Sequence, residues 1–253
     1  MIIKKIKILK SKVKITFANK EKLEIDKEVY PNFYLYEGKE LSNKEYKEIV
    51  EYNNDSKLLK YALNIRSKAP YSEFKLREKL YNKGANKKSV DHIIKMMKHY
   101  DLINDMMLAQ DLTEYYNSLN YGENKIKQKL SDKGIFEADI NKIKFPLSLE
   151  RKKAKNIFPK LEKKYLKYNH TQKKQHIYNA YIEQGFSSEI ARELVDNIKD
   201  KNDKDELDKL RKDYLKIKTR LSRKYQKKEL RQKVLQSLLA KGYKYNDILK
   251  VIE

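Results

Sequence analysis

The sequence predicts a mainly α-helical protein of tandem three-helix repeats in an elongated curved array, with a small β-rich element at its N-terminus. Only 6 Gly and 4 Pro occur among 253 residues, while 38% are charged and 40% apolar, which favours long helices around an apolar core. Four glycines recur at intervals of 50, 51 and 57 residues, which indicates a repeat. Residues 13–17 and 23–25 instead alternate apolar and polar side chains, which is typical of strands.

The N-terminal segment, residues 1–55, is expected to form a small β-rich element plus a short helix. The stretches VKITF at 13–17 and LEI at 23–25 alternate with period two, and Asn19 and Lys20 supply a turn between them. Ser42 and Glu45 have the spacing of a capping box, which predicts that a helix begins there.

The four repeated glycines each end a predicted helix. Apolar residues stand four and eight positions before each glycine, so they lie on one helical face. Each glycine then has the left-handed conformation that closes a helix, and apolar residues resume in a second helix after it. The glycines are Gly84, Gly134, Gly185 and Gly242, and the apolar pairs are Leu76 and Leu80, Ile126 and Leu130, Ile177 and Tyr181, and Val234 and Leu238.

A further amphipathic segment precedes each of these helix pairs, which makes each repeat a group of three helices. Since one such group buries little core alone, neighbouring repeats should stack. Pro146 should shorten the last helix of the second repeat. The first helices are expected at 57–66, 105–119, 151–168 and 206–225, and the repeats at 56–103, 104–147, 148–202 and 203–253.

The net charge of +23 is distributed unevenly along the chain. Residues 56–100 and 201–253 carry +9 each, residues 148–200 carry +5, residues 1–55 carry +2, and residues 101–147 carry −2. An excess of this size points to a polyanionic partner, most often a nucleic acid. Compositional drift toward lysine is an alternative explanation, but drift alone would not produce this contrast between segments.

Two basic clusters are the candidate contact sites, and the second lies in the stretch 209–233, which has 12 basic and 2 acidic residues. Leu210, Tyr214, Ile217, Leu221 and Tyr225 should face the core there, which leaves the basic residues for phosphates. The alternative for both clusters is a solvated helix face. The first cluster is Arg66, Lys68, Lys75, Arg77, Lys79 and Lys83, and the second is Arg211, Lys212, Lys218, Arg220, Arg223 and Lys224.

Several kinds of site have no signature in the sequence. The absence of cysteine excludes disulfides and fits a reducing compartment. Neither a phosphate-binding loop nor a metal-ligating histidine pair occurs, so we expect no cofactor, no metal site and no catalysis. The acidic stretch at 203–208 is interpreted as a helix cap rather than a metal site. We expect a cytoplasmic protein that does not enter a membrane.

The ordered motifs of the first two repeats resemble those of the RecX family, which modulates the RecA recombinase, in its longer Gram-positive form. The third and fourth repeats match only in outline, and His99-Tyr100 departs from the more typical pattern. The matching residues are Ala62-Leu63, Arg66, Ser72-Glu73, Leu76, Leu80, Lys83-Gly84, Leu102-Ile103-Asn104-Asp105, Ala109, Gly122, Ile126, Leu130 and Lys133-Gly134-Ile135.

The resemblance implies a non-enzymatic regulator that binds the RecA filament on single-stranded DNA, along its groove. Such a protein hinders filament extension, ATP hydrolysis and strand exchange. We expect it to be a monomer, with RecA and single-stranded or duplex DNA as partners. The alternatives are a general DNA-binding helical protein without a recombinase partner and, less well supported, a nuclease with an unrecognised site.

Overall fold

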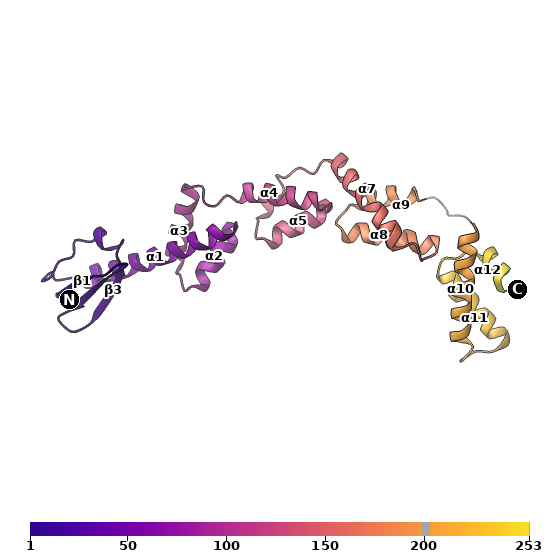
Figure 1. The fold of residues 1–253 in the computed structure, drawn as a ribbon, viewed down its shortest axis with the longest axis horizontal. Coiled ribbons are helices and arrows are strands. Elements are labelled where there is room, and N and C mark those ends of the chain that lie inside the picture. The colour runs from indigo at the N-terminus through magenta and orange to yellow at the C-terminus, as the bar shows by residue number, and fades with distance from the viewer. Residues whose placement is uncertain (199–202, 253) are drawn as a thin grey trace. The chain divides into compact units, whose positions relative to one another are not determined.

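The structure, a computed structural model, describes residues 1–198 and 203–252, with the side chains of 203 and 204 outside the description. The chain divides into two compact units, one of residues 1–109 with 132–139 and the other of residues 110–131 with 140–253. Figure 1 shows the small sheet followed by groups of helices along the chain. The prediction of a mainly helical protein with a β-rich N-terminal element is therefore confirmed.

The N-terminal sheet contains strands β1 (Ile3–Ile8), β2 (Lys12–Phe17) and β3 (Lys22–Asp26), antiparallel in the order β1-β2-β3. The two strands expected from the alternating pattern are β2 and β3, and Lys20 takes a φ of 68° in the turn between them. Strand β1 was not predicted. Its pairing with β2 shifts between Ile3 and Lys5, and this bulge breaks the alternation by which a strand is recognised.

Helix α1 (Asn43–Lys68) begins at Ser42 with the predicted capping box, in which the Ser42 and Glu45 side chains bond to each other's backbone N–H. A short 3-10 turn, η1 (Tyr30–Asn32), precedes it. The short helix expected before residue 55 and the helix expected at 57–66 are one continuous helix, so the boundary after residue 55 falls inside α1. No Gly or Pro interrupts 43–68, and its first half packs on the sheet through Ile49 while its second half enters the next core through Ala62.

The remaining helices follow in groups of three. We call these groups repeats 1 to 4, and the second half of α1 serves as the first helix of repeat 1. The helices are α2 (Glu73–Asn82) and α3 (Lys87–His99) in repeat 1, α4 (Asp105–Ser118), α5 (Glu123–Asp132) and α6 (Glu137–Ile140) in repeat 2, α7 (Leu147–Lys164), α8 (His170–Glu183) and α9 (Ser188–Asp196) in repeat 3, and α10 (Asp203–Leu221), α11 (Lys227–Ala240) and α12 (Tyr245–Ile252) in repeat 4.

The four predicted glycine stops are confirmed, because each glycine has a φ between 79° and 88°. After α2, the Ala85 N–H bonds to the Leu80 carbonyl at 3.2 Å and the Gly84 N–H to the Tyr81 carbonyl at 2.8 Å, which is the Schellman pattern. The apolar residues four and eight positions earlier are all buried, as expected from their spacing.

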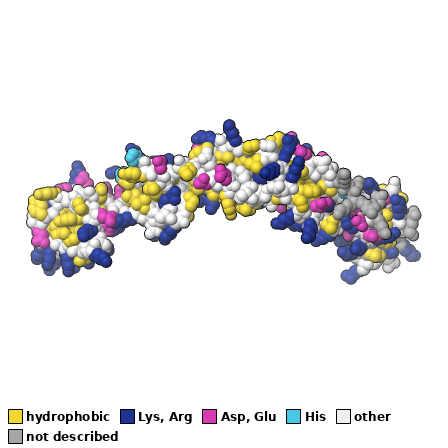
Figure 2. Space-filling view, turned by 45° about the horizontal axis from the view of Figure 1, so that its top comes forward, with side chains coloured by type: hydrophobic (Ala, Val, Ile, Leu, Met, Phe, Trp, Pro, Cys, Tyr) yellow, Lys and Arg dark blue, Asp and Glu magenta, His cyan; other side chains and the backbone are white. Residues whose placement is uncertain are grey.

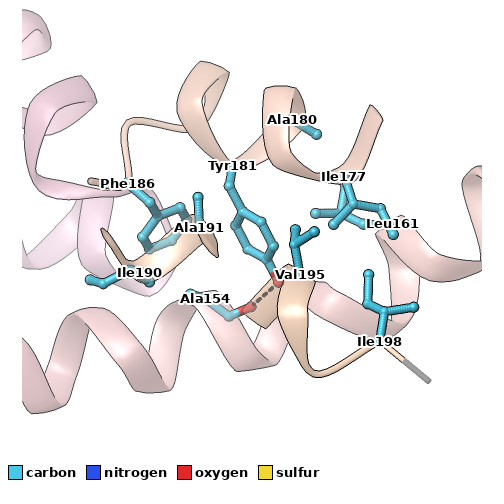
Figure 3. Packing of buried hydrophobic residues seen from close by; sticks show 10 residues of the cluster. All are labelled: Ala154, Leu161, Ile177, Ala180, Tyr181, Phe186, Ile190, Ala191, Val195 and Ile198. Atoms are coloured by element: carbon cyan, nitrogen blue, oxygen red, sulfur yellow. Dashed lines mark hydrogen bonds between the residues drawn. The ribbon is translucent and has the colours of Figure 1, made fainter. Parts of the chain in front are cut away.

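Repeat 3 illustrates how a group of three helices closes on a core of its own. Tyr181, fully buried on α8, donates a hydrogen bond from its hydroxyl to the Ala154 carbonyl of α7 at 3.0 Å (Figure 3). Phe186 packs edge-on against the Tyr181 ring, with 5.6 Å between ring centroids. The buried hydroxyl therefore has a partner, and the ring fills the space between the three helices.

The last helix of repeat 2 is short, as Pro146 predicts, but it ends earlier than this proline requires. Helix α6 stops at Ile140, and Pro146 instead occupies the N-cap position of α7 with a φ of −60°. Proline suits the start of a helix, where its missing N–H leaves no hydrogen bond unmade.

Candidate nucleic-acid interface

Repeats 1 and 2 are joined end to end at the N-terminus of α2. The Ser72 hydroxyl donates to the Lys133 carbonyl at the C-terminal end of α5 at 2.7 Å. The Asp105 carboxylate, at the start of α4, accepts from the Glu73 N–H in the first turn of α2 at 2.8 Å. Because a helix N-terminus is electropositive and a C-terminus electronegative, both contacts are electrostatically favourable.

Repeats 3 and 4 are joined by the same pair of contacts. Asn169, the N-cap residue of α8, donates from Nδ2 to the Lys241 carbonyl at the end of α11 at 2.9 Å. Glu206, in the first part of α10, accepts from the His170 N–H at 2.9 Å. Glu206 therefore caps the preceding repeat's middle helix, which differs from the sequence-based interpretation that the acidic stretch at 203–208 caps its own helix.

The junction between repeats 2 and 3 replaces the capping side chain with backbone. The Gly122 N–H donates to the Gln184 carbonyl at 2.8 Å, and the Asn124 N–H donates to the Gly185 carbonyl at 3.0 Å. A Cβ on Gly122 would lie 2.3 Å from the Gly185 carbonyl carbon, so no side chain fits between the two segments. Gly122 is therefore required by this close approach.

A buried ion pair reinforces this junction between repeats 2 and 3. Glu150 accepts from the Glu123 N–H at 3.1 Å and lies 2.5 Å from Lys153 Nζ through its other carboxylate oxygen. Lys153 also donates to Asn117 Oδ1 and the Tyr121 carbonyl, at 2.7 Å each. The Glu150 and Lys153 side chains are only 5% and 2% exposed, so their charges stabilise each other away from water.

The three junctions share an acidic residue that sequence reasoning missed. Asp105, Glu150 and Glu206 each stand near the start of a repeat's first helix and accept a backbone N–H from the preceding repeat's middle helix. The available signal is an acidic residue near the start of each first helix. It is weak, because acidic residues are also common there as caps of their own helix.

The arginines of the first basic cluster hold repeat 1 together. Arg66 donates from Nε to the Leu102 carbonyl at 2.7 Å and is partly buried. Arg77 donates to Glu73 at 2.8 Å and to Asp91 at 2.5 Å, which links α2 to α3. These guanidinium groups are already engaged by the fold, so they contribute less than expected to an open contact surface.

The lysines of the first cluster are more available to a partner. Lys68 is exposed at the end of α1, and Lys75 forms an ion pair with Glu78 at 3.0 Å. Lys79 and Lys83 lie over the rings of Tyr71 and Tyr61, with 5.2 Å and 5.1 Å from Nζ to the ring centroids. An aromatic ring orients an ammonium group without neutralising its charge.

The second cluster lies along α10 and the turn after it. Lys212, Lys216 and Arg220 follow one another at intervals of four residues, and all are exposed. This spacing places them in one stripe on the helix. Lys216 was not among the predicted residues, although its spacing from Lys212 and Arg220 marks it. Lys216, Arg220 and Arg223 also line an open depression with Leu215 and Thr219.

The other basic residues of this cluster lie beside that stripe. Arg211 is 3.6 Å from Asp208, and Lys218 lies over the Tyr214 ring at 5.3 Å. Arg223 and Lys224 are exposed in the turn before α11. Opposite the stripe, Leu210 and Ile217 are buried against α11 and α12, as predicted for the apolar positions of this helix.

Two pairs of neighbouring tyrosines in repeats 2 and 4 divide between core and surface. Tyr116 and Tyr243 are buried, while Tyr115 and Tyr245 are exposed. The Tyr243 hydroxyl donates to Asp213 at 3.0 Å, and burial raises the pKa of this tyrosine. Among the residues described, no group of three His, Asp or Glu side chains is arranged to hold a metal ion. Within the same residues, no helix has the length and apolarity needed to cross a bilayer.

These features define a class of helical repeat protein, in which the repeats are joined end to end and the terminal repeats are basic. The chain is similar over most of its length to regulatory proteins of the RecX family. No family model matches it.

Relatives named "Regulatory protein RecX" show this similarity. The protein from Clostridioides difficile strain 630 is 37% identical over 131 residues, which cover 51% of this chain and 61% of that one. The protein from Listeria innocua is 27% identical over 94% of this chain and 90% of its own length. A crystal structure of regulatory protein RecX, 25% identical, superposes with a TM-score of 0.63 over 78% of this chain and 98% of that chain.

Proposed function

We propose that this protein binds RecA filaments on single-stranded DNA along their groove and inhibits filament extension, ATP hydrolysis and strand exchange. Its similarity to proteins named "Regulatory protein RecX" over nearly the whole chain is the observation that carries the proposal. The protein acts without catalysis of its own, in the cytoplasm, where recombinase assembles on chromosomal DNA.

The repeat junctions support this proposal physically. Each junction brings together the ends of two middle helices, so the same kind of contact recurs from one repeat to the next. A filament also presents a regularly repeating surface. Repeats of this kind therefore suit a partner that offers several equivalent positions along one groove.

The stripe on α10 supports a contact with DNA in the filament. Lys212, Lys216 and Arg220 are exposed, and none of them forms an ion pair among residues 1–198 and 203–252. Such residues release counterions from the phosphates they contact, so the interaction weakens as salt rises. The stripe therefore supplies affinity, while the recognition of RecA depends on other surfaces.

The decisive experiment measures DNA-dependent ATP hydrolysis by the cognate RecA at substoichiometric amounts of this protein. Strong inhibition at ratios too low to coat the DNA is expected. The variant K212E/K216E/R220E should lose most of this inhibition, while K44E/K47E/K57E, with the same charge change on exposed α1 positions, should retain it. Equal inhibition by wild type and the α10 variant would remove the stripe from the mechanism.

A general DNA-binding function is the second candidate. Lys79 and Lys83, which lie over aromatic rings in repeat 1, would bind bare DNA as readily as a filament. On this alternative, RecA is inhibited only at amounts that coat the DNA, and the protein binds bare DNA equally well without RecA.

A further inference from the structure

The outer face of the N-terminal sheet carries five lysines. In the sheet register, Lys5 and Lys22 flank Thr16, and Lys7 lies opposite Lys14. Since alternate residues of a strand point to opposite faces, these residues lie on the side away from the buried Val13 and Ile15. We call this surface the lysine face, and its lysines, all exposed, are Lys5, Lys7, Lys12, Lys14 and Lys22.

The lysine face is only partly neutralised. Glu24 lies 2.7 Å from Lys14 and 3.3 Å from Lys12, and hydrogen bonds from these two lysines lower the pKa of Glu24. Across the residues that the structure describes, Lys5, Lys7 and Lys22 have no ion pair. Lys7 also faces Lys14 directly across the β1–β2 ladder, and like charges in that position destabilise a sheet. A bound anion would relieve this repulsion.

Protection of the sheet edges does not account for all five lysines. Lysines often prevent edge strands from pairing with other chains, and Lys5, Lys7 and Lys22 stand on the edge strands β1 and β3. However, Lys12 and Lys14 belong to β2, the central strand, which has a neighbour on each side. The β1 edge is also partly covered, because the Gly38 N–H donates to the Ile3 carbonyl at 2.8 Å.

The lysine face is open to a partner because the rest of the domain packs on the opposite side. Ile49 of α1 joins Val13, Ile15 and Ile25 in the core beneath the sheet. Figure 2 shows Lys and Arg side chains gathered along the lower side of this N-terminal part of the chain. Since the core and α1 occupy one side of the sheet, the five lysines remain accessible on the other.

We propose that the lysine face binds the phosphate backbone of single-stranded nucleic acid without regard to sequence. Protein interfaces concentrate aromatic and apolar anchors and are poor in lysine, and Thr16 is the uncharged side chain that the sheet register places among these lysines. Lysine acts as a point charge, which suits phosphates and does not discriminate between bases. This surface acts without RecA and goes beyond the function proposed above.

The net charge of residues 1–55 gave no indication of the lysine face. Residues 1–55 carry only +2 overall, because acidic side chains offset the lysines in the total. Several of these acids stand on α1, among them Glu45, Glu48 and Glu51, and α1 covers the other side of the sheet. These acidic side chains of α1 therefore lie on the opposite side of the sheet from the five lysines.

The test compares K5Q/K7Q/K22Q with the matched control K44Q/K47Q/K57Q, which removes three exposed lysines from α1. Binding of the full-length protein to labelled oligothymidine is followed by fluorescence anisotropy from about 50 to 200 mM KCl. Each lost phosphate contact makes the negative slope of log K against log salt less steep by about 0.7 for a single strand, so the slope of the sheet variant should be less steep than that of wild type by about two. The control should keep the wild-type slope.

A second measurement uses the wild-type protein and therefore does not depend on how the variants fold. Lysine acetylation with and without oligothymidine, followed by mass spectrometry, should show protection of Lys5, Lys7 and Lys22 but not of Lys44 and Lys47. A wild-type slope in the folded sheet variant, or no protection of the sheet lysines, would overturn the proposal. If the sheet variant K5Q/K7Q/K22Q keeps DNA binding but loses binding to phosphatidylserine vesicles, the proposal is overturned in favour of a membrane surface.

Discussion

The junction between repeats 2 and 3 differs from the junction between repeats 3 and 4 in what fills the contact. At the first, two backbone segments meet at Gly122 and Gly185, and a buried ion pair of Glu150 and Lys153 lies beside them. At the second, the Asn169 side chain spans the gap, and Glu206 is only partly buried. The same helix-end contact is therefore made either by close backbone approach or by a capping side chain.

The largest expected effect comes from breaking the buried ion pair. Replacing Lys153 with Met leaves the Glu150 carboxylate buried without its partner, which typically costs about 3–5 kcal/mol. Urea unfolding followed by circular dichroism should show this loss. Lys152→Met, at an exposed neighbouring position, is the control and should unfold like wild type. Equal midpoints for the two variants would show that this junction does not depend on the pair.

The next effect compares two glycines with the same local conformation. Gly84→Ala adds only the strain of a positive φ, about 1 kcal/mol, because nothing lies within 4 Å of its Cβ position. Gly185→Ala adds the same strain and also places Cβ 2.3 Å from the Lys125 backbone nitrogen. We expect Gly185→Ala to lower the thermal midpoint at least twice as much. Equal shifts would mean that the junction opens at little cost.

A smaller effect is expected at the junction between repeats 1 and 2, where Asp105 caps α2. Asp105→Ala removes the acceptor and should cost about 1 kcal/mol, whereas Asp105→Asn keeps an oxygen there. Burial raises the pKa of Asp105 above its ordinary value of 3.8. The folded state then holds more protons than the unfolded state, so stability falls as pH rises through this interval.

The difference in unfolding free energy between Asp105→Asn and wild type should therefore grow in favour of Asn as the pH rises from about 3.8. Urea titrations at several pH values measure this difference. A constant difference across that range would show that the carboxyl is not buried at the junction in solution.

The smallest effect concerns a cap inside one helix rather than across a junction. The Ser42 backbone N–H and hydroxyl lower the pKa of Glu45 from 4.5 to about 2. The capping box therefore stabilises α1 fully above pH 4.5, and this contribution is lost as pH falls toward 2. Glu45→Ala should remove this acid dependence, as hydrogen exchange of the first turn of α1 can show. Identical exchange in both proteins at pH 3 and pH 6 would contradict it.

Contacts within a repeat could be predicted from the sequence, whereas contacts at the junctions could not. The glycine stops and the apolar stripes follow from local rules, so Gly185 and Tyr181 are found where the pattern puts them. Contacts between repeats are set by tertiary structure, so Gly122 and Lys153 gave no signal of their role. Lys153 is a buried lysine within a basic sequence, and only its neighbours in space distinguish it from solvent-exposed lysines.

The candidate contact residues show the same division. Spacing placed Leu210 and Ile217 in the core, but the basic residues predicted for α10 did not include Lys216. Spacing did not separate Arg66 and Arg77, which bond within repeat 1, from Lys68, which is exposed. Side chains of one charge type are alike in sequence, and their hydrogen-bond partners decide which of them a ligand can reach.

The shared helix-end contact has a consequence for how such chains change length. Each middle helix has hydrogen-bond donors at its N-terminus and free carbonyl acceptors at its C-terminus. At each junction the N-terminus of one middle helix contacts the C-terminus of the next. Duplication of a whole group would thus create a compatible joint at once, whereas a partial duplication would leave both halves unmatched. Variation within this architecture should accordingly occur in steps of about fifty residues.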